Sequence, residues 1–195
     1  VSAAPVAGAG ETGVLNGNTL VINGVGIDAA NANDDQASNT IVDSSVKSAS
    51  AIAIAAAINK KTAMTGVTAT AEANVLKGSG FTAGTVTALN LNGVDVAISL
   101  DANSSRDDVI TAINAAQGKT GVVASAWGEG ITLTAADGRN ISISSDATDA
   151  AALGLTGLTI GTAGDDTDAV TFYSTVKLSS DKAFSVESGS EGNDN

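Results

Sequence analysis

Hydrophobic and polar positions along this chain follow one pattern twice. In each copy an apolar run ends in Asn-Gly, an Ala-rich run with helical spacing ends in Ile-Asn, and Thr-Gly-Val opens an alternating run. Such periods are the main sequence signal for helices and strands. The pattern therefore predicts two related strand-helix-strand units. Their segments are 20–25, 55–59 and 65–69 in the first copy, and 89–94, 109–114 and 120–124 in the second.

The spacing between the copies locates an insertion. Ile58 and Ile113 are 55 positions apart, as are the glycines of the two Thr-Gly-Val triplets, whereas the two Asn-Gly pairs are 69 positions apart. The first copy is therefore 14 residues longer between its turn and its helix. We place these extra residues within 28–43, where the run 31–39 is polar and is expected to be a solvated loop. A duplicated unit with one enlarged loop favours a scaffold or surface protein over an enzyme.

Two helices are expected, each with a narrow apolar face that must pack on a sheet. The first spans 48–60, where alanine gives high helix propensity. The second begins after Ser105, a good N-cap residue, and ends before Gly118. The expected inward residues are Ile52, Ala55, Ala56 and Ile58 in the first helix and Val109, Ile110 and Ile113 in the second.

The remaining alternating runs predict strands joined by short turns. Hairpins are expected at 128–130 and at Asp137-Gly138, and a short helix capped by Asp146 is expected to end at Gly154. The expected strands are 19–27, 67–76, 86–100 with a break at Asn92-Gly93, 121–127, 131–135 and 141–144, followed by a closing hairpin of 170–178 and 183–186.

These elements predict an α+β fold of two related lobes, each a small antiparallel sheet with one packed helix, plus the closing β-hairpin. We expect the lobes to join near Gly84. The predicted division is an entry linker at 1–18, a first lobe at 19–84 with its insertion, a second lobe at 85–165, and the closing hairpin with a polar tail at 166–195.

Composition excludes several classes of function. The net charge is −12, with 21 acidic and 9 basic residues, so the surface repels nucleic-acid phosphates and anionic lipid. No apolar run approaches the roughly 20 residues that span a bilayer. The chain has neither Cys nor His, which removes disulfides, the usual zinc ligands and imidazole catalysis. We therefore expect no catalytic residues, no bound cofactor and no metal centre.

Four features are candidate sites, and each also has a purely structural interpretation. The acidic runs 31–35 and 165–168 lack the spacing of known calcium loops, which leaves calcium binding open but disfavoured. Trp127 is expected to cover a core or a hairpin rather than to bind a ligand. Asn103 and Asn140 lie in Asn-x-Ser triplets that arise readily in so Asn- and Ser-rich a chain. The Ser and Thr residues of turns are candidate acceptors of O-glycans.

The doubled signature resembles the repeat motif in the variable central region of bacterial flagellins and hook-associated proteins. In the second copy the likeness continues through 130–141, and 175–180 with 184–186 resembles the segment that leads a flagellin back to its filament core. Flagellins polymerise through long terminal helices with heptad-like repeats, and neither 1–18 nor 181–195 shows that pattern. The resemblance thus implies an outer fragment of a flagellin.

This resemblance also implies a structural, secreted protein of the extracellular flagellar filament, which serves motility, presents antigenic loops and carries O-glycans. Its implied partners are other flagellin subunits, contacted through regions outside this chain, and antibodies, while the fragment itself is expected to be a monomer. An alternative is a hook-associated or adhesin-type binding module, although scarce aromatic residues disfavour a sugar site. A secreted enzyme is the least supported alternative.

Overall fold

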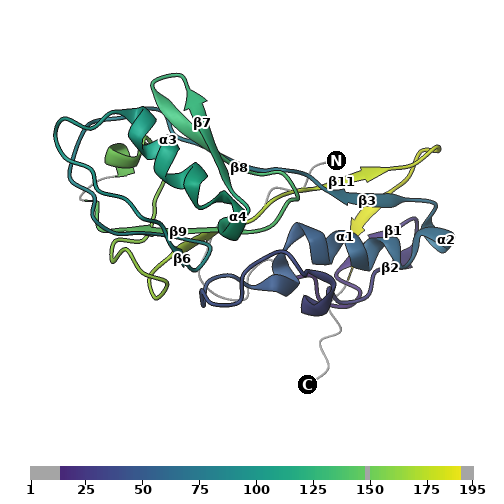
Figure 1. Cartoon of the computed structure of the whole chain (residues 1–195). Helices are drawn as coiled ribbons and strands as arrows, with labels where there is room; N and C mark the ends of the chain where they lie inside the picture. Colours follow the sequence, from purple (N-terminus) through teal and green to yellow (C-terminus); the bar gives the residue numbers. More distant parts are fainter. Residues whose placement is uncertain (1–13, 148–149, 190–195) are drawn as a thin grey trace.

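The computed structural model describes residues 14–147 and 150–189, which form two lobes side by side in an elongated molecule (Figure 1). The fold is α+β, with several small antiparallel sheets and two main helices packed against strands. The elements are β1 (Leu20–Ile22), β2 (Val25–Gly26), η1 (Ala32–Asp34), η2 (Lys47–Ala49), α1 (Ala51–Asn59), α2 (Thr62–Thr65), β3 (Thr68–Ala71), β4 (Asn74–Lys77), β5 (Leu89–Leu91), β6 (Val94–Asp95), α3 (Arg106–Ala115), α4 (Gln117–Thr120), β7 (Val123–Trp127), β8 (Gly130–Ala135), β9 (Ile141–Ser145), η3 (Ala150–Leu153), β10 (Val170–Phe172), β11 (Val176–Ser179) and β12 (Val186–Ser188).

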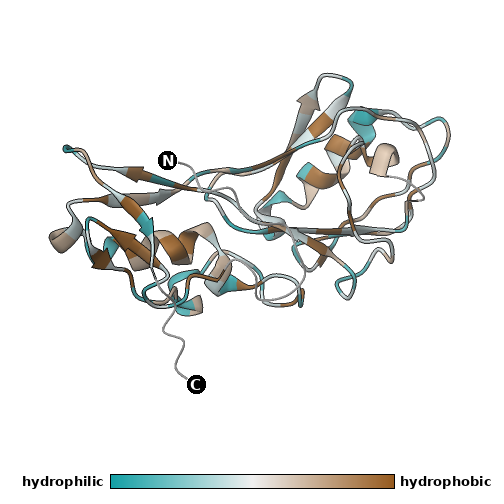
Figure 2. Cartoon of the chain, turned by 180° about the vertical axis from the view of Figure 1, so that it is seen from behind, coloured by the Kyte–Doolittle hydropathy of each residue, from teal (hydrophilic) through white to brown (hydrophobic). Residues whose placement is uncertain are grey.

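Each lobe has its own hydrophobic core. The first lobe, which we define by β1, β2, β3, β11, β12, α1 and α2, encloses a smaller core that includes Ile22 and Ile58. The second lobe, defined by β4 to β10 with α3, α4 and η3, encloses a larger core around Leu91, Ile113 and Ile143. Figure 2 shows hydrophobic residues on the helices and strands of both lobes, with hydrophilic residues mostly in connecting loops.

The two Asn-Gly pairs form equivalent tight turns. Asn23 and Gly24 have φ of 50° and 76°, and Asn92 and Gly93 have φ of 54° and 74°. A two-residue hairpin of type I′ needs positive φ at both central residues, which Asn and Gly tolerate best. The turns therefore connect β1 to β2 and β5 to β6, as the sequence predicts.

Both helices form where the pattern places them, with small shifts at their ends. In α1 the Ser50 hydroxyl accepts a hydrogen bond from the Ala53 N–H, so the helix begins after this cap, slightly later than expected. In α3 the cap at Ser105 is confirmed, and the Asp108 carboxylate accepts from the Ser105 N–H at 2.7 Å. The left-handed residue that ends this region is Gly121 rather than Gly118.

The buried faces of the helices partly match the expectation. Ile58 and Ile113 are buried in equivalent places, whereas Ile52, Ala56 and Ile110 are only half-buried. In α1 the gaps are filled instead by Ala51, Ala53 and Ala57. Alanine brings the helix close to its sheet, so the smaller lobe is thin.

Strands from the end of the chain complete the first lobe. β11 pairs with β3, and β12 pairs with β1. In the second lobe the same two roles belong to β8, which pairs with β7, and to β9, which pairs with β5. The first lobe is thus built from two separate stretches of chain, and Figure 1 shows the yellow strands of the C-terminal part lying against the blue ones.

This arrangement confirms one of the three hairpins predicted in the second half of the chain, β7–β8 at 128–130, and corrects the other two. β8 and β9 flank the turn at Asp137-Gly138, but β8 pairs with β4 and β7 while β9 pairs with β5 and β10. The predicted closing hairpin is not formed for the same reason, because β10, β11 and β12 pair with β9, β3 and β1. In each case the chain crosses from one sheet to another between consecutive strands.

The predicted strand 67–76 is divided between the lobes. β3 pairs with β11 in the first lobe, whereas β4 pairs with β8 and its Leu76 lies in the larger core. The chain therefore passes between the lobes around Glu72 and returns around Thr175, where the Glu72 N–H donates to the Thr175 carbonyl at 2.9 Å. The predicted junction near Gly84 lies inside the second lobe, where Gly84 contacts Ala152.

Two smaller points complete the fold. The expected helix at 146–153 appears as the 3-10 turn η3, with residues 148–149 outside the described part, and Gly154 ends it with φ of 74°. The Asp146 carboxylate accepts hydrogen bonds from the N–H groups of Thr87 and Ala88. Within 14–147 and 150–189, no helix has the length and apolar character needed to cross a bilayer.

Candidate functional site at the junction between the lobes

A segment that we call the brace, residues 38–46, begins inside the predicted insertion at 28–43 and continues three residues beyond it, to contact the second lobe and the segment that returns from it. The Ser44 hydroxyl donates to the Ala169 carbonyl at 2.6 Å and lies 2.6 Å from the Thr171 hydroxyl. The Tyr173 hydroxyl donates to the Ser44 carbonyl at 2.7 Å and accepts from the Val46 N–H at 3.0 Å. Burial raises the pKa of Tyr173, against a smaller opposing effect of the Val46 N–H. The brace therefore binds the return segment of the chain through residues just after the predicted insertion.

The other end of the brace contacts β9 and the turn before it. Asn140 is fully buried, and its N–H donates to the Ser38 hydroxyl at 2.9 Å. The Asn39 amide donates to the Ser142 hydroxyl at 3.4 Å. Ile41 lies against Gly93, where an added Cβ would come within 2.8 Å of it. These contacts join 38–46 to the second lobe along its length.

The polar run 31–35 is only partly solvated. Asp34 pairs with Lys60 at 2.6 Å on the surface. Asp35, by contrast, is fully buried, and its carboxylate accepts from the N–H groups of Ala37 and Ser38 at 2.9 Å each. Burial raises the pKa of Asp35, but the hydrogen bonds outweigh it and the pKa lies below its usual value. The expectation of a solvated loop is wrong for Asp35, because its carboxylate is buried and accepts hydrogen bonds from backbone N–H groups instead of water. These hydrogen bonds shape the chain at the start of the brace.

The second acidic run closes on itself. Asp168 accepts hydrogen bonds from the Ser144 hydroxyl, the Thr162 N–H and the Ala163 N–H, the last at 2.8 Å. Asp165 accepts from the Thr167 N–H at 2.9 Å. These carboxylates are occupied in shaping a loop. Among the residues that the structure describes, no group of three or more acidic, His or Cys side chains is placed to hold a metal ion.

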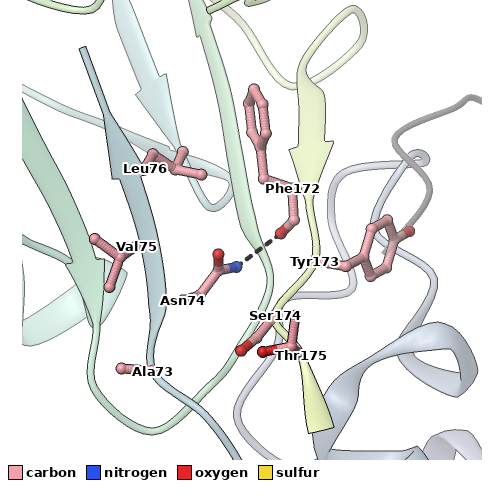
Figure 3. Close-up of a pocket in the computed structure, with 8 residues that line it drawn as sticks. All are labelled: Ala73, Asn74, Val75, Leu76, Phe172, Tyr173, Ser174 and Thr175. Carbon is pink, nitrogen blue, oxygen red and sulfur yellow. Dashed lines mark hydrogen bonds between the residues drawn. The ribbon is translucent and has the colours of Figure 1, made fainter. Parts of the chain in front are cut away.

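A cavity of about 330 Å³ lies beside the two segments that connect the lobes, as Figure 3 shows. The Asn74 amide crosses it and donates to the Phe172 carbonyl at 2.8 Å and to the Arg139 carbonyl at 3.0 Å. The Ser174 hydroxyl donates to the Glu72 carbonyl. The lining mixes apolar and aromatic residues with the polar side chains of Asn74, Ser174 and Thr175, and Tyr173 is its single titratable residue.

A second cavity, of about 270 Å³, lies between the brace and α4. Three of the nine basic residues line it, namely Lys47, Lys119 and Arg139. Arg139 is neutralised by Asp137 at 2.6 Å. Burial raises the pKa of Asp137, but the hydrogen bonds and charge of Arg139 outweigh it and the pKa is lowered. The positive charge at this cavity is therefore partly neutralised within the fold.

The other candidate residues lie apart from this junction. Trp127 is 50% exposed at the end of β7, and the Lys77 ammonium lies 4.3 Å from the centre of its ring, so it does not cover a core. Asn103 is exposed in the loop before α3. Asn140 is inaccessible to a glycosyltransferase in the folded chain because it is fully buried. The structure thus separates two triplets that look alike in sequence.

Sequence reasoning missed the asparagines that end each helix as structural residues. The Asn59 amide donates to the Ala69 carbonyl at 2.8 Å, and its carbonyl accepts from the Ala69 N–H at 2.7 Å. Asn114 makes the same pair of bonds with Ala124, at 3.0 and 2.8 Å. The sequence signal for these asparagines is the Ile-Asn pair that ends the helical run in both copies. The repetition marks the position but does not indicate that the side chain binds a strand.

A known family model matches part of the second lobe. Residues 88–137 match the family model described as the flagellin hook IN motif. This match covers β5, β6, α3, α4, β7 and β8. No curated protein matches the chain. Residues 88–137, about a quarter of the chain, are therefore similar to a flagellin hook IN motif, which belongs to a family of structural, non-catalytic proteins.

Proposed function

We propose that this chain is the surface-exposed outer domain of a flagellar filament subunit. The observation that carries the proposal is the flagellin hook IN motif at 88–137, together with the place where the chain enters and leaves the first lobe. β1 and β12 are adjacent, and the Gly189 N–H donates to the Thr19 carbonyl at 2.9 Å. A domain whose two ends lie side by side can be carried on two neighbouring segments of a polymerising core.

The brace supports the same proposal. A domain on the outside of a rotating filament experiences drag, and a hinge between its lobes would let them swing. Residues 38–46 oppose such a hinge through hydrogen bonds to Ala169, Tyr173 and Asn140. The lobes are proposed to follow the predicted repeat, with the first lobe as a second, discontinuous copy of the motif. The segment before it, 1–18, is proposed as the entry linker.

The surface accounts for the remaining parts of the proposal. A net charge of −12 keeps neighbouring outer domains apart and fits a domain that assembles only through other regions. The Ser- and Thr-rich exposed turns are proposed acceptors of O-glycans, and the loops are proposed antigenic sites in an extracellular location. Mass spectrometry of protein from native filaments tests the glycans, and unmodified peptides throughout would contradict that part alone.

Immunogold electron microscopy of intact flagella tests the main proposal. Antibodies raised against this chain should label the filament along its whole length without any permeabilisation. Labels confined to the hook, the hook–filament junction or the tip would instead support the alternative of a hook-associated protein. The hook in the description of the matched motif is the reason to keep that alternative. A flagellated strain that lacks the coding gene, labelled in parallel, is the control, and absence of label on wild-type flagella would refute both.

Sedimentation of the purified chain provides a second test. The proposal expects a monomer at micromolar concentrations, because subunit contacts are proposed to lie in regions outside this chain. Assembly of this chain alone into filaments would contradict the division between a polymerising core and an outer domain. A glycan array addresses the adhesin alternative, for which saturable binding would be required.

A further inference from the structure

The strand ladders of the two lobes share one register. In the second lobe, β7 and β8 are joined by a two-residue turn, Gly128-Glu129. In the first lobe, β3 and β11 pair with the same alignment of equivalent residues. The aligned pairs are Val123–Thr134, Ala124–Leu133, Ser125–Thr132 and Ala126–Ile131 in the second lobe, and Thr68–Ser179, Ala69–Leu178, Thr70–Lys177 and Ala71–Val176 in the first.

The next pair along each ladder shows what replaces the turn. In the second lobe Trp127 lies opposite Gly130. The corresponding pair in the first lobe is Glu72 and Thr175, which are bonded N–H to carbonyl at 2.9 Å. Residues 73–174 therefore occupy the place that Gly128-Glu129 occupies in the second lobe. They contain the whole of the second lobe.

The strand pairs β1–β12 and β5–β9 agree with this equivalence. Ile22 lies opposite Val186 as Leu91 lies opposite Ile143. The side chains of the two Asn-Gly turns show the same equivalence. In the first lobe the Ser185 N–H donates to the Asn23 side chain at 2.9 Å. The Ser142 N–H donates to the Asn92 side chain at 2.8 Å. The repeat thus extends through every strand that the two lobes share.

We propose that the second lobe is an insertion in a hairpin turn of the first, and that Gly128-Glu129 is the equivalent extension point of the second lobe. At this turn the chain accommodates additional residues, or a further lobe, without disrupting either core. The inference concerns the construction of the molecule and does not depend on its place in a flagellum.

The environment of the turn supports this role. Gly128 and Glu129 are exposed, and a Cβ on Gly128 would meet no atom within 4 Å. The turn projects from the second lobe beside α3 in Figure 1. Its contacts with the rest of the lobe include the Arg106 side chain, which donates to the Gly128 carbonyl at 2.6 Å, and a backbone bridge between Glu129 and Gly80. An insertion after Gly128 leaves the β7–β8 ladder itself intact.

The Asn92-Gly93 turn is the matched contrast. It also joins two strands with two residues, but Asn92 is buried and its amide donates to the Thr120 carbonyl at 2.8 Å. Gly93 lies against Ile41 of the brace. Added chain there displaces the brace and separates Asn92 from its partners. Turn length alone therefore does not make a site permissive.

The test inserts the same 20-residue Gly/Ser segment after Gly128 in one variant and after Asn92 in another, in the full chain. Loop-closure entropy grows slowly with length, so we expect the Gly128 variant to lose less than about 8 °C in Tm. The Asn92 variant should lose at least about twice as much, because it also breaks buried contacts.

Amide hydrogen exchange provides the second readout. Protection of β8 and β9 should be unchanged in the Gly128 variant and reduced in the Asn92 variant. Equal losses in Tm, a larger loss for the Gly128 variant, or its failure to fold would overturn the proposal. An eight-residue version at both turns, expected to give the same order with smaller shifts, guards against a result specific to one linker.

Discussion

Asn59 and Asn114 each protect an exposed edge of a sheet. β7 is an edge strand in the order β4-β8-β7, and its Ala124 turns its N–H and carbonyl away from β8 and towards Asn114. The amide side chain supplies one donor and one acceptor, as a neighbouring strand would. Unpaired strand edges invite association with other chains, so this contact also protects the chain against aggregation through β7.

Replacing Asn114 with Ala should lower the free energy of unfolding by about 1–3 kcal/mol, because it leaves both Ala124 backbone groups without their partner. Urea unfolding followed by circular dichroism measures this. The control is Asn103→Ala, an exposed loop position, which should change stability by less than about 0.5 kcal/mol. Equal effects of the two substitutions would show that the edge is satisfied by water.

Asp168 links the stability of the second lobe to pH. Its burial raises the pKa, but hydrogen bonds from Ser144, Thr162 and Ala163 lower it below the ordinary value of 3.8. A carboxyl whose pKa is lower in the folded state stabilises the fold above its unfolded pKa, and this stabilisation is lost as the pH falls through the folded pKa.

We therefore expect Asp168→Asn to lower Tm near pH 6, with a difference from wild type that narrows as the pH falls below about 4. Thermal unfolding from pH 6 to pH 2 measures it. Asp107→Asn, at an exposed position in the first turn of α3, is the matched control. A difference that stays constant across this range would mean that the carboxylate contributes through shape and not through charge.

Among the elements, the brace decides how the lobes sit. The brace lies in the part of the first copy that is 14 residues longer than the second copy. It contacts the second lobe partly through residues that have no counterpart in the repeat. Tyr173 is central because its hydroxyl both donates to Ser44 and accepts from Val46. A phenyl ring at this position would keep the packing and remove both bonds.

Tyr173→Phe should lower the free energy of unfolding by about 1–3 kcal/mol and should increase hydrogen exchange within 38–46. Exchange in α3 should remain as in the wild type. Mass spectrometry of the exchanged protein resolves the two segments. If 38–46 keeps its protection, the brace is held by its contacts with Asn140 and β9 instead.

At this scale the sequence predicted helices better than strand partners. The period of α3 and the cap at Ser105 are local properties, and both appear in the structure. The partner of a strand is not local. Nothing near 176–179 indicates pairing with β3, more than 100 positions earlier, so the pattern was interpreted as a hairpin with the adjacent run.

The whole molecule is nested, and this sets the order in which it unfolds. The second lobe is one continuous stretch, whereas the first lobe joins two stretches across it. If the second lobe unfolds, the first must close a long flexible loop, at a cost of about 3–4 kcal/mol relative to a two-residue turn. If the first lobe unfolds, the second lobe keeps all of its strands. It loses only its contacts with the brace.

Consequently, Ile58→Ala should weaken only the first lobe, so that α1 and β3 lose protection from hydrogen exchange at a lower urea concentration than α3 and β8. Ile113→Ala should cost about 2–5 kcal/mol in the second lobe and should remove protection from both lobes together. Each isoleucine is fully enclosed in its own core. Independent loss of the second lobe alone, with α1 still protected, would contradict the nesting.

The sequence by itself determined the local units of this protein: two Asn-Gly turns, two helices and the equivalence of Ile58 with Ile113. Turn geometry and helix periodicity depend on neighbouring residues, so they can be inferred from a short window. It also determined the absence of imidazole and thiol chemistry, and it pointed to the family whose motif matches at 88–137.

Only the tertiary structure decided which strands complete each lobe, where the chain crosses between them, and that residues 38–46 form a brace. These outcomes depend on residues far apart in the sequence, such as Ser44 with Tyr173 and Ala69 with Leu178. A pattern with period two shows that a segment is a strand and which of its faces is apolar. Its partner is chosen by competition among all edges of the folded chain, because each pairing is stabilised by the surface it buries.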